Sequence, residues 1–232
     1  MRSPQTAGRL IGILLIVHLL TGLITPYVML LPLTSPFTFA ANAPGKGFIV
    51  RSAVMMLFVG GAVTIAITIS ALPFVRQYSL AIAVWLLALA IANFCLQCVE
   101  NAAWMSMFTF SRDYATVSPA DTGVYSIVGV AVRSAWKWVH YTHLLILVSW
   151  MLLLFVALWR ANLVPVVFGI LGVITTLMQM LGITLPQFLA YPSPSPEAMG
   201  MPLAFVYVGL ALWLIVKGLS AIPEEANHGV RS

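Results

Sequence analysis

The sequence predicts an all-α integral membrane protein: one bundle of six transmembrane helices with both termini in the cytoplasm. The first observation is composition, since 61% of the 232 residues are hydrophobic and only 7% are charged. A soluble domain carries roughly 25% charged residues, so a soluble enzyme, a disordered chain and a nucleic-acid-binding protein are excluded. The second is that six apolar segments approach the roughly 20 residues that a spanning helix needs. The third is that these segments are continuous, whereas barrel strands alternate apolar and polar residues.

The six spans are expected at residues 10–31, 49–74, 79–104, 137–159, 163–184 and 202–217, in one domain that covers residues 1–232. Prolines separate the spans, because proline interrupts a helix. Pro32 marks the first loop and Pro73 closes the second span, while residues 191–196 alternate proline with serine and cannot continue a helix. Residues 105–136 are expected to form an outer loop, in which residues 124–136 could fold as a short interfacial helix.

The orientation follows from the positive-inside rule, because Lys and Arg accumulate in cytoplasmic loops. Arg9, Arg76 and Arg160 lie at tight ends of the first, second and fourth spans. All three are on the cytoplasmic side if the N-terminus is inside, and the loop between the fifth and sixth spans has no Lys or Arg. Both termini are therefore expected in the cytoplasm.

Two polar stripes are predicted on the third and fourth spans. The first has the helical spacing i, i+4, i+7, i+8 and i+11, and comprises Asn93, Gln97, Glu100, Asn101 and Trp104. The second begins the fourth span and comprises Arg133, Lys137, His140 and His143. At 1.5 Å per residue, Glu100 lies about 32 Å and His140 about 29 Å from the cytoplasmic edge. Contact of Glu100 with Lys137 or His140 is therefore expected.

These stripes predict a polar pocket that opens to the outer leaflet. Its ligand-binding residues are expected to be Gln97, Glu100, Asn101, Lys137, His140 and His143, because ionisable groups inside a bilayer are costly and usually functional. A structural alternative stays open. Asn and Gln side chains can simply join helices, and Lys137 can extend to the lipid headgroups beside the interfacial rings of Trp136 and Trp138.

No cofactor is predicted, and a metal ion, a haem or a quinone stays an alternative. His140 and His143 at i, i+3 could share a metal ion with Glu100, as in a zinc site with two histidines and one carboxylate. No HExxH motif accompanies them. A haem held by His18 and His143 is disfavoured, because their depths, about 14 Å and about 24 Å, differ by about 10 Å.

The only two cysteines, Cys95 and Cys98, form a CxxC motif. Thioredoxin-type motifs lie at a helix N-terminus, which lowers the thiol pKa, whereas this pair lies near the C-terminal end of its span. Quinone-linked thiol oxidases place cysteines at the outer membrane face, so a redox site remains an alternative. The other interpretation is that two small cysteines fill a helix interface.

A family resemblance rests on three segments. They are Arg9-Leu10-Ile11-Gly12-Ile13-Leu14, His143-Leu144-Leu145, and Trp159-Arg160-Ala161-Asn162-Leu163-Val164-Pro165 followed by Gly169 and Gly172. This pattern resembles the bacterial multi-pass membrane family called domain of unknown function 4386. In that family a His-Leu-Leu opens a span, and a short basic loop with a proline turn leads to a glycine-bearing span. The resemblance implies a multi-pass architecture in a bacterial inner (cytoplasmic) membrane, and it implies no catalytic residue.

The function expected from these patterns is not enzymatic. The chain is expected to bind a membrane lipid or another lipophilic or anionic-headgroup ligand, or else a partner membrane subunit or a second copy, through the outer polar pocket. One alternative is a membrane oxidoreductase or metalloenzyme that uses Cys95 and Cys98 with His140 and His143. Another is a transporter of a small solute, which the lack of an internal repeat disfavours.

Overall fold

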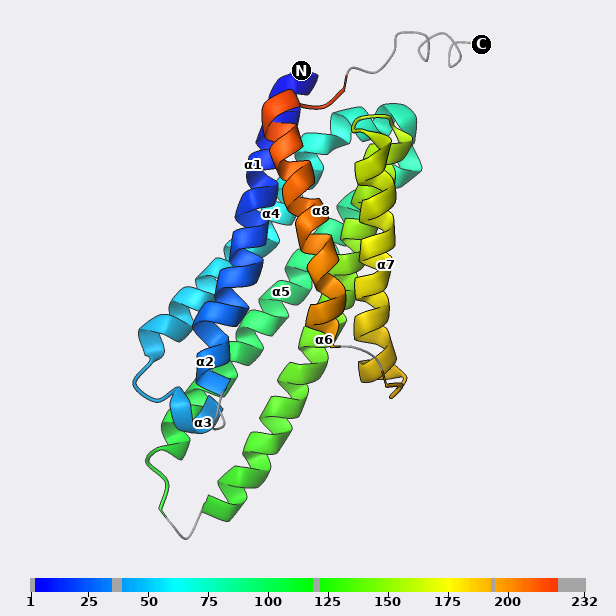
Figure 1. The fold of residues 1–232 in the computed structure, drawn as a ribbon. Coiled ribbons are helices and arrows are strands. Elements are labelled where there is room, and N and C mark those ends of the chain that lie inside the picture. The colour runs from blue at the N-terminus through cyan, green and yellow to red at the C-terminus, as the bar shows by residue number, and fades with distance from the viewer. Residues whose placement is uncertain (1–2, 35–38, 119–121, 193–194, 221–232) are drawn as a thin grey trace. The chain divides into compact units, whose positions relative to one another are not determined.

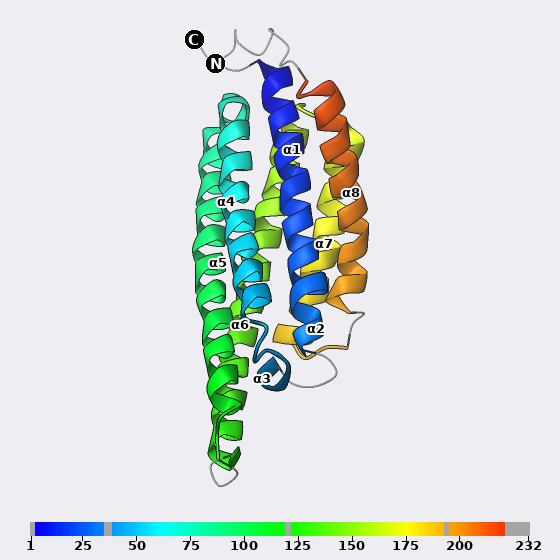
Figure 2. The same ribbon diagram turned by 90° about the vertical axis from the view of Figure 1, so that its left-hand side faces the viewer.

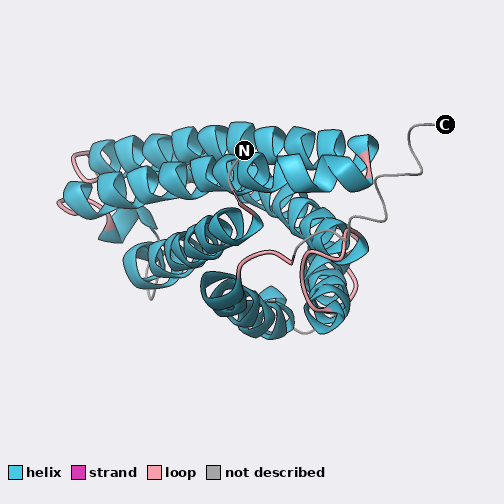
Figure 3. Ribbon diagram, turned by 90° about the horizontal axis from the view of Figure 1, so that it is seen from above, coloured by secondary structure: helices cyan, strands magenta, loops and turns pink. Residues whose placement is uncertain are grey.

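The computed structural model describes residues 3–34, 39–118, 122–192 and 195–220, and every regular element in these ranges is a helix (Figure 1; Figure 3). Six helical segments are long and apolar enough to cross a membrane: Pro4–Leu33, Gly47–Tyr78, Leu80–Tyr114, Thr122–Arg160, Val166–Phe188 and Ala198–Lys217. The predicted fold class, an all-α membrane protein with six spanning helices, is therefore confirmed. The cytoplasmic location of the termini stays a prediction.

The elements follow one another as α1 (Pro4–Leu23), η1 (Ile24–Leu30), α2 (Leu31–Thr34), α3 (Phe39–Asn42), α4 (Gly47–Tyr78), α5 (Leu80–Tyr114), α6 (Thr122–Arg160), α7 (Val166–Phe188) and α8 (Pro196–Lys217). They contribute to two compact units. Unit 1 comprises Met1–Ile16, Ile65–Ala90 and Leu147–Ser232, and unit 2 comprises Val17–Thr64 and Ile91–Ile146. Because α1, α4, α5 and α6 run through both units, each unit is described by itself.

Unit 1 is built on glycines that face aromatic rings. A side chain at Gly169 would overlap Trp159, and one at Gly172 would overlap Phe155. Helices α7 and α8 pack on each other within this unit (Figure 1; Figure 2). Small residues let helix backbones approach closely, which is the main source of helix association in lipid.

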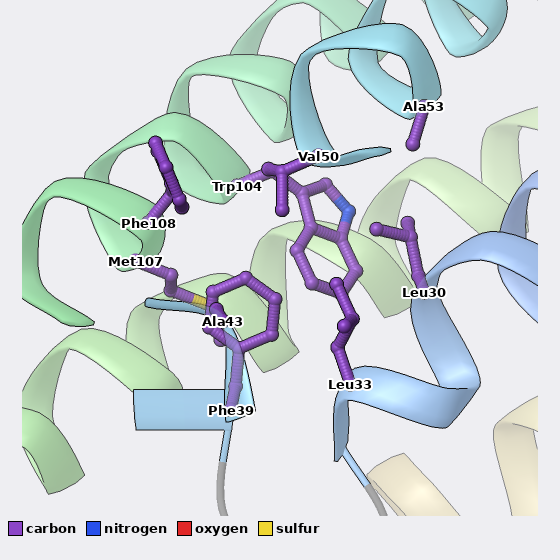
Figure 4. Close-up of a cluster of buried hydrophobic side chains, with 9 residues drawn as sticks. All are labelled: Leu30, Leu33, Phe39, Ala43, Val50, Ala53, Trp104, Met107 and Phe108. Carbon is purple, nitrogen blue, oxygen red and sulfur yellow. The ribbon is translucent and has the colours of Figure 1, made fainter. Parts of the chain in front are cut away.

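Unit 2 contains an apolar cluster near the start of α4 and the end of α5. Its buried members come from η1, α2, α3, the loop after α3, α4 and α5, and are Leu30, Leu33, Phe39, Ala43, Val50, Ala53, Trp104, Met107 and Phe108 (Figure 4). Trp104 lies at its centre, with its ring 5.5 Å from that of Phe39. This cluster fixes the rotation of α5 one turn beyond Glu100, and so helps to direct that carboxylate.

The predicted outer loop at residues 105–136 is wrong for most of its length. Helix α5 continues to Tyr114, and α6 already begins at Thr122. Residues 124–136 are the first turns of α6, not a separate interfacial helix. Backbone hydrogen bonds of a helix are internal, so it can extend beyond the apolar layer where no proline or glycine stops it. Residues 119–121 of the predicted loop lie outside the described residues.

Prolines also stop fewer helices than the sequence suggests. Pro73 does not close the second span, because α4 runs through it to Tyr78. Pro26 changes the helix type instead of ending it. The N–H of Leu31 reaches back to the carbonyl of Pro26, five residues earlier, which is the hydrogen bond of a π-helix.

Candidate functional site

The centre of the candidate site is the carboxylate of Glu100, which is bound by two histidines from α6. Its Oε1 lies 2.8 Å from Nδ1 of His140, and its Oε2 lies 2.6 Å from Nδ1 of His143. The side chains of Glu100 and His143 are only 5% and 6% exposed, whereas that of His140 is 30% exposed. The carboxylate thus bridges a buried histidine and a histidine that reaches the surface of the unit.

The network continues from His143 to α4. Nε2 of His143 lies 3.0 Å from Oδ1 of Asn93, and the amide nitrogen of Asn93 donates to the hydroxyl of Thr64 at 3.2 Å. That hydroxyl donates to the carbonyl of Gly61 at 2.7 Å. Polar groups in a low-dielectric interior are costly unless they are hydrogen-bonded. The chain of contacts therefore joins α4, α5 and α6 through groups that satisfy one another.

A second pair of amides lies on the same face of α5. The side-chain nitrogen of Gln97 donates to Oδ1 of Asn101 at 3.1 Å, and the nitrogen of Asn101 donates to the carbonyl of Val54 at 3.3 Å. Both side chains are buried. These amides bind α5 to α4 and form no hydrogen bond with the Glu100 carboxylate within the part of the chain that the structure describes.

Aromatic rings continue the contact of α5 and α6 on the loop side of Glu100. The ring of Trp104 lies 4.7 Å from that of Trp136, which in turn stacks on His140 at 5.4 Å and 17°. Trp104 follows Glu100 by four residues, and Trp136 precedes His140 by four. In two antiparallel helices this register places one contact a turn beyond the other. The polar pair and the aromatic pair therefore fix the same alignment of the two helices.

One ring nitrogen at the site is left open. Glu100 holds Nδ1 of His140, whereas Nε2 of His140 has no hydrogen-bond partner among the described residues. A carboxylate that binds one nitrogen of an imidazole orients the ring and selects its tautomer. The arrangement can therefore present Nε2 as a proton acceptor, or as a donor when the ring is charged.

The decisive comparison with known proteins is the scan against protein families. The family model described as "Domain of unknown function (DUF4386)" matches residues 10–218. The chain belongs to the DUF4386 family. The family match covers every residue of the candidate site, and with the six apolar helices it indicates a multi-pass membrane protein. No curated protein and no solved structure matched the chain.

The structure brings together five of the six side chains predicted for the pocket. Glu100, His140 and His143 share one hydrogen-bonded group, and Gln97 and Asn101 lie beside it on α5. The expected contact of Glu100 with His140 is confirmed. Lys137 is placed differently, since it is exposed and its Nζ lies over the rings of Trp138 and Tyr141 at 5.6 and 5.9 Å. The partners of Glu100 among the described residues are the two histidines and not Lys137.

The alternative metal and redox sites receive no support from the arrangement. Within the described ranges, no group of three His, Cys, Asp or Glu side chains is placed to hold a metal ion. Cys95 and Cys98 are free thiols, exposed and half-buried respectively. Both ring nitrogens of His143 form hydrogen bonds, one with Glu100 and one with Asn93.

Sequence reasoning missed the contribution of α4. Thr64 is fully buried and receives Asn93, yet a threonine in an apolar span looks like an ordinary packing residue. A signal was present, because Thr64 and Thr68 are spaced i, i+4 and so share one face of the helix. Asn93 was recognised as part of the stripe on α5, but its link to His143 depends on helix rotation, which the spacing does not give.

Proposed function

We propose that this DUF4386 protein binds an anionic amphiphile, such as a lipid with a negatively charged headgroup, at the loop end of unit 2. The observation that carries the proposal is the open Nε2 of His140, on a ring that is 30% exposed and held by Glu100. In its charged form this nitrogen donates to a phosphate or carboxylate oxygen. Glu100, His143, Gln97 and Asn101 then support the binding residue and do not themselves touch the ligand.

The net charge of unit 2 favours an anion. Unit 2 carries five exposed cations, none of which forms an ion pair with another described residue: Lys46, Arg51, Arg112, Arg133 and Lys137. Against these stand two described acidic residues, Glu100 and Asp113, and the histidines already hold Glu100. A basic residue near an anionic membrane surface contributes about 1 kcal/mol of attraction.

The aromatic residues on α6 suit an amphiphile better than a free anion. Lys137 lies over Trp138 and Tyr141, and His140 packs against Trp136 and Tyr141. Trp and Tyr concentrate at the membrane interface, where apolar rings meet headgroups. The indole N–H of Trp136 is buried without a hydrogen-bond partner, so a second donor is unsatisfied beside His140.

We place the protein in an inner membrane, since outer-membrane proteins are typically barrels.

The test compares lipid retention by native mass spectrometry after reconstitution with equal amounts of phosphatidylglycerol and phosphatidylcholine. We expect the wild type to retain phosphatidylglycerol preferentially. His140→Gln and Lys137→Gln should each weaken that preference about fivefold, which corresponds to about 1 kcal/mol per contact. Lys217→Gln is the matched control, because Lys217 is an exposed cation at the end of α8 in unit 1. Equal retention of both lipids, or an equal loss in the control, would contradict the proposal.

A further inference from the structure

We infer that Glu100, His140 and His143, here called the Glu100 cluster, form a proton-binding site. A proton enters this site through His140 and does not pass beyond Asn93. The ligand in this inference is the proton, and the argument uses only the hydrogen bonds within unit 2. It goes beyond the proposed lipid site and holds whether or not a lipid binds there.

The protonation of His143 follows from the orientation of an amide two contacts away. The hydroxyl of Thr64 donates to the carbonyl of Gly61, so it accepts the hydrogen bond from Asn93. The atom of Asn93 that faces Thr64 must then be its NH₂ group, and the atom that faces His143 is its oxygen. An amide oxygen only accepts hydrogen bonds. Nε2 of His143 therefore carries a hydrogen.

One proton is shared on the other side of the His143 ring. Nδ1 of His143 and Oε2 of Glu100 are 2.6 Å apart, slightly less than the roughly 2.7–2.9 Å of a charge-assisted N–H···O hydrogen bond. If the proton is on the nitrogen, the pair is an imidazolium and a carboxylate. If it is on the oxygen, both partners are neutral. The pair as a whole has the same net charge in both forms, so the proton can change sides without placing a net charge in the interior.

The other carboxylate oxygen links this pair to the surface. With Glu100 Oε1 accepting from Nδ1–H of His140, the free lone pair of a neutral His140 is on Nε2. A proton that binds Nε2 makes His140 an imidazolium, and its Nδ1 proton can then pass to Oε1 of Glu100. His140 returns to neutral, and the added positive charge resides on His143 beside a protonated Glu100. One proton has entered at Nε2, and none has left.

The far end of the chain does not pass protons onward. The amide oxygen of Asn93 accepts a hydrogen bond from His143, and its NH₂ group donates one to Thr64. An amide does not readily exchange its donor and acceptor groups. The site therefore stores a proton and is not a continuous path. This distinguishes it from the carboxylate and histidine relays of membrane pumps, which connect two sides.

Few other charges face the cluster. On α1, the one histidine of unit 2 is His18. Helix α4 has no charged residue between Arg51 and Arg76, and α5 offers the thiols Cys95 and Cys98 besides Glu100 itself. On α6, Lys137 and Arg133 are exposed one and two turns before His140.

The first experiment reads the proton positions directly. The full chain, labelled with ¹⁵N-histidine and held in phosphatidylcholine nanodiscs, is titrated while multiple-bond ¹H–¹⁵N spectra distinguish protonated from bare ring nitrogens. We expect Nε2 of His143 to stay protonated throughout, and both His140 and His143 to report one shared midpoint. In Glu100→Gln the two rings should no longer report a common midpoint, because the coupling is lost. A bare Nε2 on His143, or separate midpoints in the wild type, overturns the inference.

The second experiment tests the entry point and does not depend on a Glu100 variant that folds. Hydrogen–deuterium exchange at the His143 ring is compared in wild type, His140→Gln and the control Lys217→Gln, which removes an exposed cation of unit 1. We expect exchange to slow at least about tenfold in His140→Gln and to be unchanged in the control, since among the described residues only His140 links the carboxylate to the surface. Unchanged exchange in His140→Gln overturns the proposed route. Neither readout involves an anionic lipid, so failure of the lipid proposal would leave these results unaffected.

Discussion

Units 1 and 2 contain parts of the same long helices, yet different interactions hold the helices together in each. In unit 1, Gly169 and Gly172 lie against Trp159 and Phe155, and Trp150 donates one hydrogen bond to Thr68 at 2.9 Å. In unit 2, a buried carboxylate joins α5 to two histidines. Lipid gives helices little hydrophobic reason to associate, so close packing suffices for stability. The costly buried charge in unit 2 therefore calls for a functional explanation that unit 1 does not need.

The largest effect is expected where the buried charge is removed. Glu100→Ala leaves Nδ1 of both His140 and His143 without its acceptor, and removal of one partner from a buried ion pair costs about 3–5 kcal/mol. The measurement is the unfolding midpoint in mixed detergent micelles, followed by circular dichroism. Asp113→Ala is the control, because Asp113 is exposed and its loss should cost about 0.5 kcal/mol or less. Equal shifts would remove the contrast between the units.

A packing change in unit 1 should lower the stability of the protein by a smaller amount. The added methyl of Gly172→Ala would overlap the ring of Phe155, and overpacking of this kind costs about 1–3 kcal/mol. Gly22→Ala in unit 2 is the matched glycine, since nothing lies within 4 Å of its new side chain. That variant should be neutral or stabilised by up to about 1 kcal/mol, because alanine favours the helix. Thermal unfolding of the two variants side by side decides the point.

Two threonines on one helix offer a sharper comparison. Thr64→Val deprives Asn93 of an acceptor in unit 2, and Thr68→Val does the same to Trp150 in unit 1. Each leaves a buried donor unsatisfied, at a cost of about 1–3 kcal/mol. The stability losses should therefore be similar, whereas only Thr64→Val should change the ¹⁵N signals of His143. A change in those signals for Thr68→Val would show that they report general loosening.

The smallest effect is expected at the cysteines. Cys95 and Cys98 are free, and one is exposed while the other is half-buried. The double variant Cys95→Ala, Cys98→Ala should change stability by about 0.5 kcal/mol or less. It should also leave the His140 titration unaltered. If the double variant lost the shared histidine midpoint, the thiols would be part of the site, and the redox alternative would be favoured.

The sequence was sufficient for the six spans and for the two polar stripes that meet. Hydropathy finds spans because every backbone group in lipid must be bonded internally. The spacing of Glu100 and His140 placed them at one depth, and the structure joins them. The pairing of His143 with both Glu100 and Asn93 could not be predicted, because it depends on the rotation of α6 about its own axis.

The length of the helices could not be predicted from hydropathy either. Polar residues after Trp104 and before Lys137 suggested a loop, but both segments are helical. A window of apolar residues measures the depth of the lipid layer and not the end of a helix. Pro73 misled for a related reason, since one missing N–H does not end a helix that packing supports on both sides.

The stack formed by Trp104, Trp136 and His140 has an optical consequence. The two indole rings lie 4.7 Å apart, and the imidazole covers one of them. While His140 carries the entering proton, its positive charge lies against the π-electrons of Trp136, which attract cations. The fluorescence of this indole pair should therefore dim in molecules whose proton rests on His140 and recover once the proton has passed to Glu100, and Trp136→Phe should abolish that response. The intrinsic tryptophan fluorescence of the unlabelled protein can therefore report the protonation of His140.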